Sequence, residues 1–164
     1  MGICAKELHR WVIRPTLQRI GIHNQVAEQL LLTTAALESG LGAHIRPEGQ
    51  RGLGIYQIQS LTHRHVWDEC LFRTPELASV VRGLASQHDF LEQPHAELAT
   101  NLSYSTAIAW FIYARNPEFS LPEEPGCEEL IRLWKRFYHP KGALDMDAAL
   151  QHVRGLTSEC EAAA

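Results

Sequence analysis

The sequence predicts a single all-α globular domain with at most a small β-hairpin. Three observations support this fold class. The chain has 164 residues, with 45% apolar and 21% charged, which suits one folded core rather than a disordered segment. Apolar residues recur along most of the chain at the spacing of one helix face. Alternation of the kind found in strands is confined to residues 55–59.

Two helices are expected before residue 41. The first covers residues 4–20, contains Pro15, which should bend or break it, and places on one side Leu8, Trp11, Val12 and Leu17. The second begins after Asn24, a favourable cap, and ends at Gly40. Residues 41–54 then form a glycine-rich loop, and residues 55–59 form a short strand or an extended turn.

The rest of the chain is expected to be helical over residues 60–71, 75–86, 95–115, 127–138 and 147–155. The segment 95–115 has the longest apolar periodicity, so it should form the centre of the core. We divide this unit into an N-terminal helix (residues 1–22), a main domain (residues 23–142) and a C-terminal helix and tail (residues 143–164).

Composition argues against several classes of function. A net charge of −4 gives no electrostatic basis for binding nucleic acid. No stretch is long and apolar enough for membrane insertion, and no charged and apolar leader of a secretory signal is visible. The four cysteines lack the spacing of a zinc or dithiol site, although two bridges are permitted: Cys4, Cys70, Cys127 and Cys160. We therefore expect no metal and no cofactor.

Glu38 is the candidate catalytic residue. It lies at the end of an apolar helix, directly before Ser39 and Gly40. A carboxyl group at the edge of a core can keep its proton near neutral pH because burial disfavours the charged form, and such a group can act as a general acid. The alternative is an exposed glutamate in the last helical turn, where its charge would oppose the helix dipole slightly.

A glycosidase of the general type also needs a second carboxylate, as nucleophile or base. Glu48 and Asp68 are the nearest acidic residues in the sequence, but neither lies in a segment that looks catalytic.

Four segments carry a resemblance to a known family. They are Glu38-Ser39, Gly54-Ile55-Tyr56-Gln57-Ile58, Asn101-Leu102-Ser103-Tyr104-Ser105 and Trp134-Lys135-Arg136-Phe137-Tyr138-His139. In order and spacing they resemble the motifs of the lytic transglycosylase family of the lysozyme-like superfamily. The resemblance covers most of residues 24–140 and implies a lysozyme-like fold.

The resemblance also implies an activity. Lytic transglycosylases cleave the β-1,4 bond between MurNAc and GlcNAc in peptidoglycan glycan strands. They use one glutamate, first as acid and then as base, while the 6-hydroxyl of the sugar attacks the anomeric carbon. The product then carries a 1,6-anhydro-muramic end, and no second carboxylate is needed.

The substrate-binding residues implied by the motifs are Ser39, Gln50, Tyr56, Gln57, Asn101 and Tyr138. Gln57 would line the cleft and hydrogen-bond the sugar. Tyr56 stands where the family usually has methionine and would form a larger cleft wall. Asn101 would fix the cleft geometry, and Tyr138 would hydrogen-bond the glutamate or the N-acetyl group.

The sequence departs from the family at several positions. Gln50 would stand in for a serine that is missing from the loop, and His139 replaces an asparagine. Ser105 replaces a glycine, and Ile108 replaces a tyrosine. Two alternatives therefore stay open: a structural component of a virion or secretion machine that has lost the chemistry, and true hydrolysis by the same cleft.

A wall-degrading enzyme without a secretory signal must be delivered by a phage particle, a secretion machine or a holin. We expect a phage-borne protein, with other virion proteins as further partners.

Overall fold

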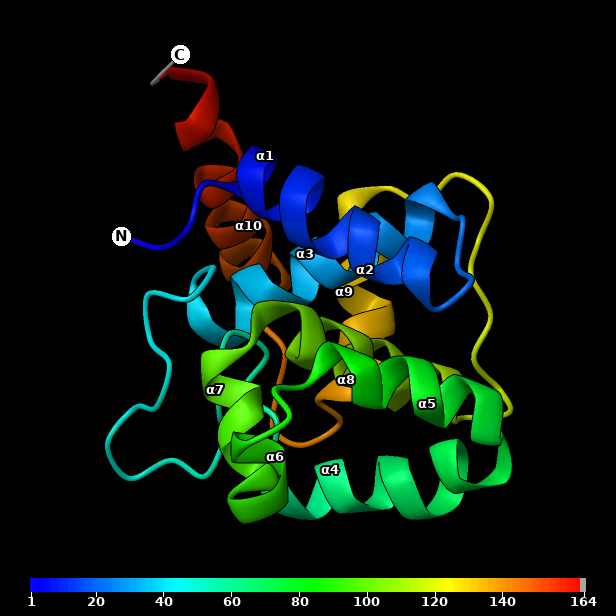
Figure 1. Cartoon of the computed structure of the whole chain (residues 1–164). Helices are drawn as coiled ribbons and strands as arrows, with labels where there is room; N and C mark the ends of the chain where they lie inside the picture. Colours follow the sequence, from blue (N-terminus) through cyan, green and yellow to red (C-terminus); the bar gives the residue numbers. More distant parts are fainter. Residues whose placement is uncertain (163–164) are drawn as a thin grey trace.

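Helix α8 (Leu102–Ala114) runs through the middle of the protein, and other helices pack around it (Figure 1). The computed structural model describes residues 1–162 of the chain. Every residue of α8 from Tyr104 to Tyr113 is buried. The helix packs against α2, α3, α5 and α7. The expectation that this segment forms the centre of the core is confirmed.

The described residues form an all-α domain. Its helices, in order, are α1 (Ala5–Leu8), η1 (His9–Ile13), α2 (Arg14–Arg19), α3 (Gln25–Ser39), α4 (Ser60–His65), η2 (Val66–Cys70), η3 (Leu71–Arg73), α5 (Pro75–Leu84), α6 (Asp89–Glu92), η4 (Pro94–Ala96), α7 (Glu97–Thr100), α8, α9 (Cys127–Leu133), η5 (Trp134–Tyr138) and α10 (Met146–Ala162). The segments η1, η2 and η5 are π-helical turns, and η3 and η4 are 3₁₀ turns.

Helix α3 has the ends that the sequence predicts. The side chain of Asn24 accepts hydrogen bonds from the backbone N–H groups of Val26 and Ala27. Gly40 ends the helix in the left-handed conformation, with φ 60°. Because both caps are local, the position of Glu38 in the last turn follows directly from the sequence.

The first helix is continuous in space but contains the π-helical turn η1 just before Pro15. Proline has no N–H group to close an ordinary helical turn, and the wider turn accommodates it. A π-helical turn holds more residues than an α-helical turn, so the side chains within and after η1 point in directions different from those of an ordinary helix. Trp11, which we expected on the apolar side, is 67% exposed, so that placement is wrong.

The expected helix over residues 95–115 is divided at Asn101. This residue has an extended backbone, with φ −121°, and its side chain accepts a hydrogen bond from the N–H of Tyr104. Asn101 therefore begins α8 as its cap, because a short side-chain acceptor competes well with a continuing helix. The expectation of one unbroken helix is wrong at this point.

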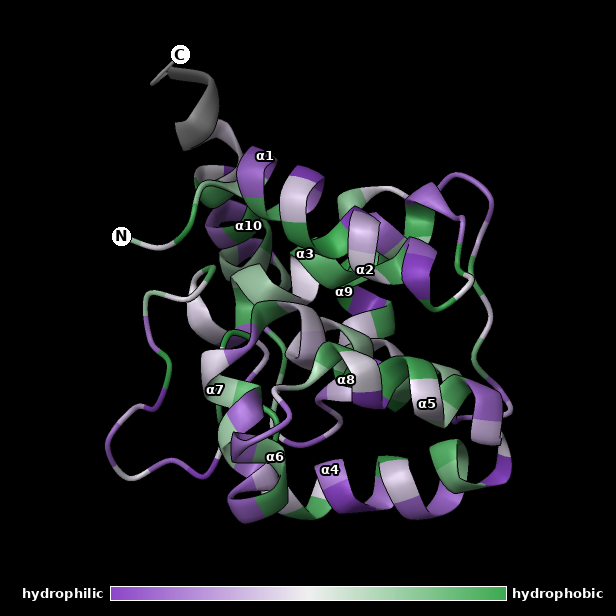
Figure 2. Ribbon diagram, viewed as in Figure 1, coloured by the Kyte–Doolittle hydropathy of each residue, from purple (hydrophilic) through white to green (hydrophobic). Residues whose placement is uncertain are grey.

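The loop over residues 41–54 extends from one side of the molecule and is largely hydrophilic (Figures 1 and 2). Within the described residues, the only β-type pairing is an isolated antiparallel bridge between Leu53 and Ile58, so no strand forms over 55–59. Helix α10 is longer than expected, and residues 163–164 of the predicted tail lie outside the described part of the chain.

Two further observations bear on the exclusions made from the sequence. Cys70 and Cys127 are free thiols. Within residues 1–162, no helix has both the length and the apolar character needed to cross a membrane.

A buried chain of hydrogen bonds joins α4 to α8. The indole N–H of Trp67 donates to the hydroxyl oxygen of Tyr104 at 2.8 Å, and that hydroxyl lies 2.6 Å from Nε2 of His63. The chain continues from His63 to His95, whose Nδ1 atoms lie 2.9 Å apart. A hydrogen bond between two Nδ1 atoms requires that one of them carries no proton, so at least one of the two imidazoles is neutral.

We expect the free energy of unfolding to fall as the pH is lowered from about 6.5 to about 4. Burial, with a contribution from His95, lowers the pKa of His63 from 6.5 to about 4, so the unfolded chain binds the proton first. The loss should reach about 3 kcal/mol. Urea unfolding of wild type and His63→Gln across this pH range measures it.

His63→Gln removes the group that binds the proton, so the free energy of unfolding of this variant should change less than that of the wild type over the same pH range. The matched control is His88→Gln, since the side chain of His88 is 85% exposed. Equal slopes for wild type and His63→Gln would contradict the prediction.

Candidate active site

The carboxyl group of Glu38 lies at the end of α3, with its side chain only 8% exposed. Two side chains from the other end of the sequence contact it. The indole N–H of Trp134 donates to Oε1 at 2.9 Å, and Nδ1 of His139 lies 3.2 Å from the same oxygen. Glu38 is therefore a nearly buried carboxyl group, and the alternative of an exposed glutamate is wrong.

A π-helical turn brings both contacts to Glu38. In η5 the N–H of His139 bonds the carbonyl oxygen of Trp134 at 2.9 Å, five residues back. The two rings stack at a centroid distance of 5.2 Å and an interplanar angle of 22°. An ordinary helical turn would place residues 134 and 139 on different sides, so the wider turn allows both to face one carboxyl group.

The surroundings of Glu38 raise its pKa above 4.5. Removal of the carboxyl group from water is the largest cause, and the hydrogen bond from Trp134 and the interactions with His139 oppose it in part. The C-terminal end of α3 also disfavours a negative charge. Glu38 thus keeps its proton to a higher pH than an ordinary glutamate, as a general acid requires.

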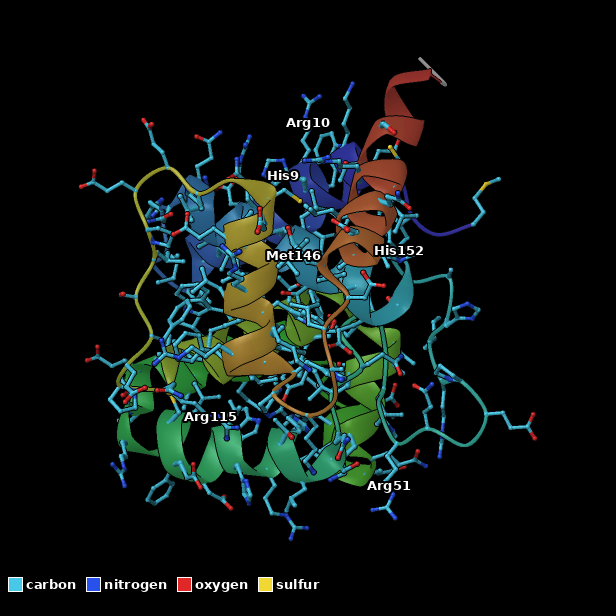
Figure 3. All side chains as sticks on the ribbon, turned by 180° about the vertical axis from the view of Figure 1, so that it is seen from behind. His9, Arg10, Arg51, Arg115, Met146 and His152 are labelled. Carbon is cyan, nitrogen blue, oxygen red and sulfur yellow. The ribbon has the colours of Figure 1, made fainter. Side chains whose placement is uncertain are left out.

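Glu38 lies between two hollows in the protein surface. The first, of about 430 Å³, is also lined by Gln50, Gly52, Gln57 and Tyr138. The second, of about 450 Å³, shares Glu38 and Gln50 and is also lined by N-terminal residues and by α10. Seen from behind, His152 of α10 and Arg51 of the long loop lie on the same side of the molecule (Figure 3).

Among the described residues, Glu38 is the one acidic side chain that lines either hollow. Glu48 and Asp68 are exposed and line neither. In the part of the chain that the structure describes, the cleft therefore offers no second carboxylate as nucleophile or base. Any chemistry of a carboxylic acid in these two hollows depends on Glu38.

Three of the predicted binding residues line the cleft with Glu38: Gln50, Gln57 and Tyr138. The amide of Gln57 is used within the protein, since Nε2 donates to the carbonyl oxygens of Gly54 and Ile45 at 2.8 and 3.0 Å. The hydroxyl of Tyr138 donates to the carbonyl oxygen of Tyr56 at 2.7 Å. Both side chains hold the cleft wall in place through these bonds. Neither of them forms a hydrogen bond with the carboxyl group of Glu38.

Ser39 lines only the second hollow, and its hydroxyl group is engaged there. It donates to the carbonyl oxygen of Ile55 at 2.6 Å and accepts from the N–H of Gly42 at 2.8 Å. Ser39 therefore joins the end of α3 to both ends of the loop. It positions the residue before it, Glu38, and is 2% exposed.

Tyr56 is not part of the cleft wall, contrary to the sequence prediction. Its ring is fully buried, and its hydroxyl lies 3.0 Å from Oγ1 of Thr106 in α8. The next residue, Gln57, has φ 48°, and this tight turn directs the two side chains to different environments. Tyr56 supports the cleft from behind through its contact with Tyr138.

Asn101 is also outside the cleft. Its amide donates to the carbonyl oxygen of Leu84 at 2.8 Å and to Glu97 at 2.9 Å. The residue lines a separate hollow and caps α8. Its influence on the site is indirect, through the position of the central helix.

Trp134 is the residue that sequence reasoning missed. Within the segment 134–139 the sequence analysis assigns a binding role to Tyr138 and none to Trp134. The five-residue interval between the rings of Trp134 and His139 is the one sequence feature that could have indicated this contact. It places both rings on the same side of the helix only where a π-helical turn forms.

These features define the class of site: one buried, proton-retaining carboxyl group in the cleft of an all-α domain. No family model, no curated protein and no solved structure matches the chain.

Proposed function

We propose that the protein is a peptidoglycan lytic transglycosylase of the lysozyme-like type, with Glu38 as its acid and base. The observation that carries the proposal is the nearly buried Glu38 carboxyl group, with a raised pKa and no other acidic side chain of the described residues in the cleft. A mechanism with one carboxyl group fits this site better than the scheme with two.

The reaction has two proton transfers. Glu38 donates its proton to the glycosidic oxygen, and the bond from that oxygen to the anomeric carbon breaks. The Glu38 carboxylate then removes the proton of the 6-hydroxyl as that oxygen bonds the anomeric carbon. A 1,6-anhydro ring forms, and Glu38 regains its proton without consuming water.

The remaining cleft residues hold the glycan strand in position. The cleft walls are firm because Gln57 and Tyr138 are hydrogen-bonded to the backbone. Gln50, in the exposed loop, lines both hollows and can contact sugars on either side of the cleaved bond. Rigid positioning of this kind contributes to the rate because the reacting groups are held in place before reaction.

Digestion of purified peptidoglycan, followed by mass spectrometry of the soluble fragments, tests the proposal. Transglycosylation gives fragments with anhydro ends, each lighter by one water molecule than the hydrolysed fragment. Reducing muramic ends would instead establish hydrolysis by the same cleft.

The second candidate is a structural virion or secretion component that keeps the fold without the chemistry. One observation favours it: the amide nitrogen of Gln57 and the hydroxyl of Tyr138 are engaged within the protein, which leaves fewer polar groups to bind a sugar. Absence of any fragment from a folded wild-type protein would support this candidate.

A further inference from the structure

The two oxygens of Glu38 have different surroundings. Oε1 lies within hydrogen-bonding distance of both Trp134 and His139, whereas no described residue donates to Oε2. With the His139 proton on Nδ1, Oε1 accepts two hydrogen bonds and is a poor site for a further proton. When Glu38 is protonated, its proton therefore resides on Oε2.

His139 is held beside this carboxyl group but remains in contact with water. Its ring stacks on Trp134, and its side chain is 50% exposed, compared with 8% for Glu38. The indole of Trp134 carries no charge, so His139 is the one contact of Oε1 that can be charged.

We infer that His139 is a positioning residue: its contact with Oε1 keeps the proton of Glu38 on Oε2, and its charge determines how readily Glu38 loses that proton. The pair, and not Glu38 alone, would then determine the pH range in which the cleft contains an acid. The consequence for catalysis rests on the proposed function, whereas the coupling between the two side chains does not.

A neutral His139 with its proton on Nδ1 and a charged His139 both donate to Oε1, so the carboxyl group stays in place in either state. The charged ring favours the Glu38 carboxylate, and the neutral ring favours the protonated acid. His139 itself gives no proton to the substrate and ends each cycle unchanged.

Other ionisable groups face the pair from the surrounding elements: Tyr113 of α8, Tyr138 of η5, His152 of α10, and His44, Arg51 and Lys141 from the loops. Burial raises the pKa of Tyr113 and Tyr138 well above 10, so they stay neutral. Arg51 and Lys141 line the first hollow with the pair. His152 is bonded at Nε2 to the carbonyl oxygen of Ala36, and His44 lines the second hollow.

His139→Asn is the decisive substitution. The asparagine amide nitrogen takes the place of Nδ1 as a neutral donor, so the variant removes the charge and keeps the hydrogen bond. We expect the titration midpoint of Glu38, followed by carbon-13 NMR of its carboxyl group, to rise by about one pH unit. An unchanged midpoint overturns the inference, whatever the activity of the protein.

The pH profile of peptidoglycan cleavage is the second readout. In His139→Asn the loss of activity on the alkaline side should move to higher pH by about the same amount, because Glu38 keeps its proton longer. His139→Ala should in addition lower the rate at every pH, since it removes the donor. An unchanged profile in an active His139→Asn enzyme overturns the claim that the pair determines the pH range.

The two readouts separate the inference from the proposed function. A shifted Glu38 titration in a protein that cleaves no peptidoglycan refutes the function and supports the coupling. Cleavage by Glu38 with an unshifted titration supports the function and refutes the coupling.

Discussion

Glu38→Gln should lower the rate of peptidoglycan cleavage by about 100- to 10,000-fold, the range expected for loss of a general acid. Glutamine has nearly the same shape as glutamate, and its oxygen can still accept the hydrogen bond from Trp134. It has no proton to donate to the glycosidic oxygen. Comparison of the fragments released by the two proteins, measured by mass spectrometry, gives the ratio of rates.

The substitution should leave the fold intact. Burial disfavours the charged form of Glu38, so the neutral glutamine should give an equal or higher free energy of unfolding above pH 4.5. Thermal unfolding of both proteins at neutral pH checks this. A loss of activity in a less stable protein would point to misfolding rather than to a missing acid.

The matched control is Glu48→Gln, because Glu48 is exposed in the loop and lines neither hollow. Its activity should equal that of the wild type. The pH profile is a further check: since only protonated Glu38 can donate, activity should fall as the pH rises through its raised pKa. Full activity of Glu38→Gln would mean that another group is the acid.

Gly54→Ala should destabilise the protein by about 3 kcal/mol or more, because two costs add. The backbone of Gly54 has φ 74°, a conformation that alanine adopts poorly. A Cβ atom there would also lie 1.7 Å from the carbonyl oxygen of Leu98, in α7. Since the clash is with backbone, the loop and α7 would have to separate, and urea unfolding should record the loss.

Gly49→Ala provides the matched control. Gly49 has nearly the same backbone conformation, with φ 76°, but a Cβ atom there would meet nothing within 4 Å. It should cost only about 1 kcal/mol, so the difference between the variants isolates the clash. Equal losses would show that the close approach to Leu98 contributes nothing.

The same substitution should also affect the cleft. The N–H of Gly54 donates to the carbonyl oxygen of Ile45 at 2.8 Å, and its own carbonyl accepts from Gln57. A displaced Gly54 would therefore move the wall that contains Gln57. The rate of peptidoglycan cleavage per folded molecule should therefore be lower for Gly54→Ala than for the wild type.

The sequence by itself predicted the features that depend on neighbouring residues. The caps Asn24 and Gly40 act within one helical turn, so the length of α3 and the place of Glu38 in its last turn could be predicted. The buried α8 and the all-α class also followed, because apolar periodicity reports which face of a helix meets the core.

Only the tertiary structure decided which side chains meet at Glu38. Trp134 and His139 lie 96 and 101 residues away along the chain, and a π-helical turn is needed to direct both to Oε1. The tertiary structure also decided that Tyr56 faces the core, where its hydroxyl meets Thr106. It likewise decided that Asn101 caps α8 by accepting a hydrogen bond from the N–H of Tyr104. Local spacing determines helices and their ends, whereas the packing of distant segments determines which groups are removed from water and brought into contact.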